Sequence, residues 1–271
     1  MPPANQPLDS HDPARNRLHG KTVLVTRPAE QSESLREQLE QLGAKVLVHP
    51  VIEIKSPSDL SKLDDCLKKL QQSEDFGWVV FVSGNGVNHF VSRLKRLGIS
   101  IDVLNNRNIA AIGSATLAHL KSLRIDNICS PEVSNSESLA ELLIKRAAGQ
   151  RALIIRANRG SEELGNRLES AGIDFEEVAA YHSIDVKTAD PKVLEMMAEG
   201  KIDWVTMTSS AIANSAINLF SGAIKQSGGK TKTVSISPKT SQTMRELGFD
   251  PDAEAIEFNM PGIIAAMQDS D

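Results

Sequence analysis

One βα pattern occurs twice along the 271-residue chain, about half its length apart. Arg27 aligns with Arg156 at an offset of 129 residues, and the segments that follow align in the same order at slightly smaller offsets. Three units repeated in order predict an internal duplication and two similar lobes. A ligand is then expected in the cleft between the lobes. The matching segments are 21–54 with 150–184, 78–84 with 204–210, and 112–116 with 236–240.

Near-continuous apolar runs of strand length alternate with amphipathic helical patterns. Such runs are typical of parallel strands that helices cover on both faces. The sequence therefore predicts an α/β fold of two doubly wound parallel-sheet lobes, flavodoxin-like or Rossmann-like, joined by a two-stranded connector. The predicted strands are Val23–Val25, Val46–Val48, Trp78–Val82, Ile109–Ile112, Ala152–Ile155, Phe175–Ala179, Asp203–Met207 and Thr233–Ile236.

Residues that start and stop helices support this pattern. Capping boxes predict helix starts at Ser34 and Ser138, and a residue before proline predicts two more at Asp190 and Ser237. Glycines are expected just beyond helix ends, where the backbone turns left-handed. They are Gly43, Gly98, Gly172, Gly200 and Gly248.

Composition excludes several classes of function. The net charge of −5 and the lack of a long basic run argue against a nucleic-acid partner. No apolar run approaches the roughly 20 residues that span a bilayer, so no membrane contact and a cytoplasmic location are expected. The polar, proline-rich residues 1–20 are expected to form a disordered tail. Two cysteines, Cys66 and Cys129, are expected to be reduced, buried and structural.

Motifs for common cofactors are missing from the sequence. No G-x-G-x-x-G, G-x-x-x-x-G-K-[ST] or G-x-S-x-G is present, and the six histidines form no metal-ligand pattern. No metal and no cofactor are therefore expected, and any chemistry should be acid–base and electrostatic.

Short polar segments follow six of the predicted strands, where helices are expected to begin. Ligands of open parallel sheets collect there, because backbone N–H groups at helix N-termini point at anions. Their repetition predicts a site for a ligand with several carboxylates. The alternative is that Ser83, Ser209 and Ser237 only cap helices and that the arginines form surface ion pairs. The candidate binding residues are Arg27, Ser83, Gly84, Ser114, Thr116, Arg156, Ser209, Ser210 and Lys239.

Tyr181 is the only tyrosine in the chain. It lies in a segment expected to leave one lobe, so its phenol could donate a proton to a leaving hydroxyl in a cleft. The alternative is that Tyr181 only packs against its neighbours and its hydroxyl lies in solvent. His182 is expected on the opposite face of the strand.

Two extended segments, 50–54 and 179–184, are expected to bridge the lobes. The repeats alone leave open whether each lobe is continuous in sequence or whether the N-terminal and C-terminal segments share one.

The ordered segments over about Lys21–Ile264 resemble the uroporphyrinogen-III synthase family. They include VTRPAEQSESLREQLEQLGAKVLVHPVIEI, WVVFVSGNGVNHF, IAAIGSATLAHL, VAAYHSI, WVTMTSSAIANSAINLF and VSISPKTSQTMRELG. The resemblance implies a discontinuous lobe 1 over 21–50 and 185–268, lobe 2 over 55–180, and connecting strands over 51–54 and 181–184.

The resemblance also implies an activity. The family is a cofactor-independent lyase that cyclises hydroxymethylbilane, a linear tetrapyrrole with eight carboxylates, with inversion of the last pyrrole and loss of water. It implies a small-molecule substrate and transient contact with the preceding pathway enzyme. The alternative is a noncatalytic two-lobe module that binds an anionic ligand.

Particular residues match family positions. The resemblance implies catalytic roles for Tyr181 and Thr240, and substrate contacts for Arg27, Ser83, Thr116 and Ser209. The chain departs from the family pattern at three positions. They are Ser237, where glycine is usual, Ser241, where alanine is usual, and His182, where arginine is commoner.

Overall fold

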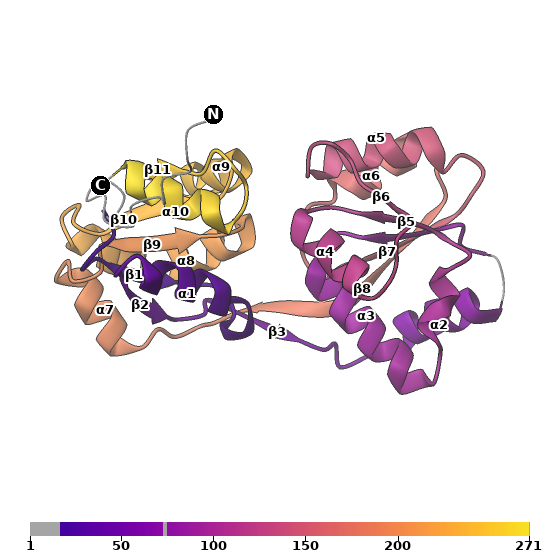
Figure 1. The fold of residues 1–271 in the computed structure, drawn as a ribbon, viewed down its shortest axis with the longest axis horizontal. Coiled ribbons are helices and arrows are strands. Elements are labelled where there is room, and N and C mark those ends of the chain that lie inside the picture. The colour runs from indigo at the N-terminus through magenta and orange to yellow at the C-terminus, as the bar shows by residue number, and fades with distance from the viewer. Residues whose placement is uncertain (1–16, 73–74, 271) are drawn as a thin grey trace, which may run out of the picture. The chain divides into compact units, whose positions relative to one another are not determined.

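A computed structural model describes residues 17–72 and 75–270 of the chain. Within these residues it contains ten α-helices and two sheets, which are built mainly of parallel strand pairs. The predicted mixed α/β class with parallel sheets is therefore confirmed (Figure 1). The chain divides into unit 1, Met1–Glu53 with Ile184–Asp271, and unit 2, Ile54–Ser183.

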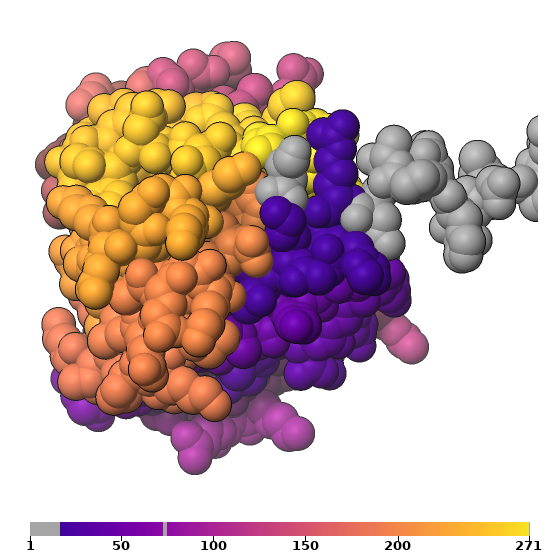
Figure 2. All heavy atoms as spheres, turned by 90° about the vertical axis from the view of Figure 1, so that its left-hand side faces the viewer, coloured from indigo at the N-terminus to yellow at the C-terminus, as the bar shows by residue number. Residues whose placement is uncertain are grey.

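The sheet of unit 1 has the strand order β11-β10-β9-β1-β2. Helices α1 and α10 pack on one face, where Leu35, Leu39 and Met267 join Val23 and Trp204 in the core. Figure 2 shows the N-terminal segment (indigo) beside the C-terminal segments (orange and yellow) on one surface of this unit. The elements are β1 (Thr22–Val25), η2 (Ala29–Gln31), α1 (Glu33–Gln41), β2 (Lys45–Val48), α7 (Pro191–Ala198), β9 (Trp204–Met207), α8 (Ser210–Gln226), β10 (Lys232–Ser235), α9 (Pro238–Glu246), β11 (Ala253–Glu254) and α10 (Met260–Asp269).

The sheet of unit 2 has the order β3-β8-β7-β4-β5-β6 and a core on each face. Along β4, Val79 and Phe81 face the core that helices α2, α3 and α4 cover. Trp78 and Val80 face the core beneath α5 and α6. The elements are β3 (Ile52–Lys55), α2 (Ser61–Gln72), β4 (Trp78–Phe81), α3 (Gly84–Leu97), η3 (Ile101–Leu104), β5 (Asn108–Ala111), α4 (Ser114–Ser122), β6 (Ile128–Cys129), α5 (Ser136–Arg146), β7 (Ala152–Ala157), α6 (Glu163–Ser170) and β8 (Phe175–Asp185).

The two sheets have corresponding strand orders. The orders β11-β10-β9-β1-β2 and β6-β5-β4-β7-β8 place the repeat-equivalent strands β1 and β7 in the same relative position. The register corresponds as well. Val23 pairs with Val46 in unit 1, and the residues 129 positions later, Ala152 and Phe175, pair with each other in unit 2.

The helix starts show where local sequence rules succeed. Asp190 Oδ1 accepts a hydrogen bond from Lys192 N–H at 2.8 Å, and Ser237 Oγ accepts one from Thr240 N–H at 3.4 Å. These two predicted caps are confirmed. All five predicted glycines also have a positive φ, between 68° and 77°.

The two capping-box predictions were wrong. Helix α5 begins after Asn135, whose Oδ1 accepts the Ser138 N–H at 2.7 Å, so Ser138 lies inside the first turn. Helix α1 begins after Ser32, because η2 leads directly into it, and Ser34 lies inside the helix. In both cases a residue upstream of the predicted serine occupies the capping position.

The described part of the N-terminal segment departs from the expected tail. Residues 1–16 lie outside the described residues, but Leu18 is fully buried in the core of unit 1. Gly20 N–H donates to Gly43 O at 2.9 Å, which fixes the segment beside the end of α1. The short strands β6 and β11, which have two residues each, were also not predicted.

The two cysteines have different environments. Cys66 is buried and donates to Glu176 Oε1 at 3.3 Å, whereas Cys129 is only half-buried, contrary to expectation. Burial, followed by the Glu176 carboxylate, raises the pKa of the Cys66 thiol from 9.0 to about 12.

This difference predicts selective labelling. Since the thiolate is the reactive form, Cys66 should resist a thiol reagent at pH 8 in the native protein while Cys129 reacts. The labelled residue is read by mass spectrometry of the peptides. The Cys129→Ser variant should then lose native labelling, and rapid labelling of Cys66 in that variant would contradict the assignment.

Candidate functional site

The parallel register aligns the carboxyl ends of the strands within each sheet. In unit 2, Phe81 at the end of β4 pairs with Ala111 of β5 and Ile155 of β7. Tyr181 of β8 pairs with Ala157, the last residue of β7. The turns after β4, β5 and β7 therefore lie on the same edge of the sheet as Tyr181.

Tyr181 and Ser83 are joined at this edge. Tyr181 is 7% exposed, and its hydroxyl oxygen lies 3.0 Å from Ser83 Oγ. Ser83 is also the N-cap of α3, where its Oγ accepts the Gly86 N–H at 3.1 Å. The capping interpretation of Ser83 is thus correct, and the same side chain contacts Tyr181. Either hydroxyl can donate in the Ser83–Tyr181 hydrogen bond, and donation by Ser83 leaves the hydrogen of the phenol free for a substrate.

His89 on α3 stacks on the Tyr181 ring. The ring centroids are 5.5 Å apart and the planes differ by 24°. Burial lowers the pKa of His89 below its usual 6.5. The imidazole is therefore largely neutral at pH 7. No sequence pattern singles out this histidine, because nothing near it in the sequence indicates the contact with Tyr181.

The turn after β5 presents open backbone donors. Gly113, with φ of 87°, is the N-cap of α4 and provides no side-chain cap. Ser114 is exposed in the first turn, while Thr116 is 4% exposed. A helix start without a side-chain cap leaves N–H groups for an anion. Gly84, at the start of α3, has no atom within 4 Å of an added Cβ, so packing does not require glycine there.

The repeat-equivalent arginines have different partners. Arg156 forms an ion pair with Glu177, 2.6 Å from Nη1 to Oε2, and donates to Ser161 O at 3.3 Å. Its charge is therefore already neutralised within unit 2.

Arg27 in unit 1 has no such carboxylate partner among the described residues. Its Nη1 donates to Met260 Sδ at 3.0 Å and its Nη2 to Gln31 Oε1 at 3.3 Å. Within the described residues its buried Nε has no hydrogen-bond partner. Burial lowers the pKa of the guanidinium. A half-buried cation without an acidic partner is a stronger candidate for anion binding than Arg156.

The turns after β9 and β10 lie at the same edge as Arg27. Ser209 is the N-cap of α8, accepting the Ile212 N–H at 3.2 Å. Ser210 Oγ donates to Lys239 O at 3.4 Å, which joins the first turns of α8 and α9. The structure therefore brings Ser210 and Lys239 together.

Thr240 and Ser241 lie in the first turn of α9. Thr240 is 2% exposed, and its Oγ1 lies 3.2 Å from Ser237 Oγ. Ser241 is fully buried, bonded to Ser235 Oγ at 2.6 Å and to the Glu254 carboxylate. The Ser241 hydroxyl therefore forms its hydrogen bonds within the core of unit 1. Tyr181 belongs to unit 2 and Thr240 to unit 1.

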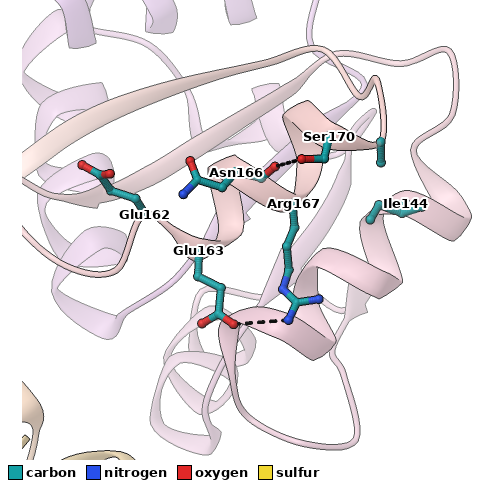
Figure 3. A pocket seen from close by; sticks show the side chains of 7 residues that line it. Ile144, Glu162, Glu163, Asn166, Arg167 and Ser170 are labelled. Carbon is teal, nitrogen blue, oxygen red and sulfur yellow. Dashed lines mark hydrogen bonds and ion pairs between the residues drawn. The ribbon is translucent and has the colours of Figure 1, made fainter.

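One cavity of unit 2 lies elsewhere, between α5 and α6. It has a volume of about 670 Å³. Arg167 and Glu163 form an ion pair beside it, and none of the predicted site residues lines it (Figure 3). The described residues include no group of three or more histidine, cysteine or acidic side chains placed to share a metal ion. None of the described helices combines the length and apolar character needed to cross a bilayer.

Comparison with known proteins identifies relatives over most of the chain. A family model described as Uroporphyrinogen-III synthase HemD matches residues 33–265. A uroporphyrinogen-III synthase of Synechococcus elongatus is 30% identical over 264 residues, which cover 94% of this chain and 97% of that protein. The porphyrin biosynthesis protein HemD of Ruminiclostridium josui is 31% identical over 195 residues, 72% of this chain. That match spans only 38% of the HemD protein's length.

Solved structures have the same fold. A mutant uroporphyrinogen III synthase from Thermus thermophilus superimposes with a TM-score of 0.66 at 18% identity, covering 93% of this chain and 98% of that one. A uroporphyrinogen-III synthetase from Helicobacter pylori gives a TM-score of 0.60 at 17% identity, with 93% and 100% covered. At these identities the likeness shows the fold alone.

Proposed function

Because the chain belongs to the uroporphyrinogen-III synthase family, we propose that it cyclises hydroxymethylbilane with inversion of the last pyrrole and loss of water. This would make it a cofactor-independent lyase of haem biosynthesis. The observation that carries the proposal is the match of the family model to residues 33–265. Placement of Tyr181 at a sheet edge with its hydroxyl bonded to Ser83 supports it.

The proposed first step is acid-assisted loss of the substrate's hydroxyl. Tyr181 donates a proton as the carbon–oxygen bond breaks, so that water leaves and the pyrrole nitrogen's electrons form an azafulvenium cation. The phenolate oxygen left behind is stabilised by Ser83 and by the N-terminal end of α3. The cation attacks the substituted α-carbon of the last pyrrole and forms a spiro intermediate. The older bond from that α-carbon to its bridging carbon then breaks, and the bridging carbon bonds to the free α-carbon of the same ring, which inverts it. The proton that a ring carbon loses on closure balances the one that Tyr181 gave.

The substrate's carboxylates require local cation and N–H donors, because the chain's net charge is −5. In unit 1 we assign carboxylate binding to Arg27, Ser209, Ser210 and Lys239. In unit 2 we assign it to Gly84, Ser114 and Thr116 in the first turns of α3 and α4. Arg156 is a weaker candidate because Glu177 already neutralises it. Thr240, bonded to Ser237, is assigned to support of the α9 turn during catalysis.

We infer that the two units arose by duplication of one α/β unit. The corresponding strand orders and the corresponding register of β1–β2 and β7–β8 support this origin. We retain two doubly wound lobes over 21–50 with 185–268 and over 55–180, linked by 51–54 and 181–184, as the proposed domain plan.

We further propose that the reaction takes place in the cytoplasm. The two unpaired cysteines are consistent with a reducing compartment. Transient contact with the enzyme that supplies the bilane would be useful, because the free bilane closes unaided to the uninverted isomer.

The test is the isomer that the purified protein makes. Freshly generated hydroxymethylbilane is supplied without added cofactor, and the oxidised porphyrins are separated. Predominant isomer III is expected, since holding the substrate favours the inverted closure over the uncatalysed one. Isomer I alone, at the rate of the protein-free blank, would contradict the proposal and favour the noncatalytic module.

A further inference from the structure

We propose that His89 is a positioning residue, which stacks on the Tyr181 ring and holds the phenol hydroxyl in the direction required for proton donation. The role rests on the proposed synthase function and extends it to a residue that none of the sequence patterns selects. His89 acts through Tyr181 and is not assigned any contact with substrate.

One helix supplies both restraints on the phenol. Ser83, the N-cap of α3, fixes the hydroxyl at 3.0 Å, and His89 covers a ring face at a centroid distance of 5.5 Å. A hydrogen bond at the hydroxyl alone leaves the ring free to turn about the axis from Cβ to the hydroxyl oxygen. A stacked partner removes this freedom, so that the oxygen and the ring plane are fixed together.

The imidazole ring, and not its nitrogens, makes the contact. In residues 17–72 and 75–270 neither nitrogen of His89 forms a hydrogen bond or ion pair to protein, and the stacking on Tyr181 is its defined interaction. An aromatic ring without polar atoms should therefore perform the same function.

Charge neutrality suits this position. Burial disfavours the imidazolium, so the ring beside Tyr181 is mostly uncharged at neutral pH. As the protonated hydroxyl leaves the bilane as water, positive charge develops on the substrate. A second cation at the proton donor would oppose that development.

The experiment compares His89→Ala with His89→Phe, and His119→Ala on α4 is the matched control for loss of a histidine in unit 2. His89→Ala is expected to lower kcat by roughly ten- to hundred-fold with little change in KM, because misplacing a reacting group lowers the rate by such factors. The share of isomer III should fall as the uncatalysed closure competes. His89→Phe should restore most of the lost turnover, and His119→Ala should behave as wild type.

A spectroscopic readout separates positioning from general damage. Tyr181 is the only tyrosine, so NMR of tyrosine-labelled protein gives one ring signal. His89→Ala should shift it and increase ring motion, while His89→Phe should keep the ring restrained. Full turnover in His89→Ala would overturn the proposal. Equal losses of kcat in His89→Ala and His89→Phe would also overturn it, because they would show that the imidazole nitrogens, and not the ring, are required. Wild-type protein that makes no isomer III would instead contradict the synthase function, whatever the ring signal shows.

Discussion

Replacing Tyr181 by phenylalanine is expected to lower kcat about 100-fold or more, because a positioned general acid contributes about 10²–10⁴-fold. The substitution keeps the ring, and therefore the stacking with His89 and the packing at the end of β8. Ser83 Oγ keeps its hydrogen bond from Gly86 N–H, so no buried group is left without a partner. Stability should fall by no more than about 1 kcal/mol, the net value of one hydrogen bond.

The measurement is the steady-state rate of isomer III formation, with circular dichroism and thermal unfolding to show that the fold persists. Ser83→Ala should also lower kcat, because it frees the phenol and removes a helix cap. Asn135→Ala is the matched control, since it removes the cap of α5 next to the edge strand β6 and leaves Tyr181 untouched. Normal turnover in Tyr181→Phe would remove the phenol from the mechanism.

Replacing Arg27 by glutamine is expected to raise KM for the bilane while leaving the protein as stable as before or slightly more stable. A hydrogen bond to a charged group is worth about 1.5–3 kcal/mol, which corresponds to a rise in KM of roughly ten- to hundred-fold. The opposite sign for stability follows from burial. The guanidinium is desolvated and, among the described residues, meets only Met260 and Gln31, neither of which is charged. Removing such a charge relieves a penalty.

Arg36→Gln provides the control, because it removes the same charge from unit 1 at an exposed ion pair with Glu40, 3.7 Å apart. Its KM and melting temperature should stay close to those of the wild type. The two quantities are measured by isomer-resolved kinetics and by thermal unfolding. Strong destabilisation by Arg27→Gln without a change in KM would identify Arg27 as a structural residue.

Local sequence signals predicted most of the secondary structure. Each of the eight predicted strands corresponds to a strand in the structure. The signal is clearest in central strands such as β4, whose four residues are all apolar and buried. Glycines such as Gly43 marked helix ends correctly, because a left-handed residue strongly favours glycine. Strands β6 and β11 were missed because two-residue edge strands have no such apolar run.

The candidate site was only partly predictable. Arg27 and Arg156 were treated as equivalent, yet only Arg156 is neutralised by an acid. The repeat alignment could have predicted this difference, because the position of Glu177 in β8 is occupied by Val48 in β2. Arg27 therefore lacks the equivalent acidic residue. The contact of Tyr181 with Ser83 joins residues 98 positions apart, and His89 reaches the same ring from the same helix. No local pattern specifies a contact over such a separation.

Unit 1 combines the first and the last parts of the chain, and this affects the order in which the protein folds on the ribosome. Unit 2 is continuous in sequence, so its sheet has all its strands once residue 185 has been translated. Strand β1 pairs on one side with β2, but its other neighbour, β9, follows much later at Trp204–Met207. Until then the nascent β1–β2 pair exposes an apolar edge, which is a substrate for chaperones. The β1–β2 pair therefore waits for the synthesis of unit 2 before its own sheet can be completed.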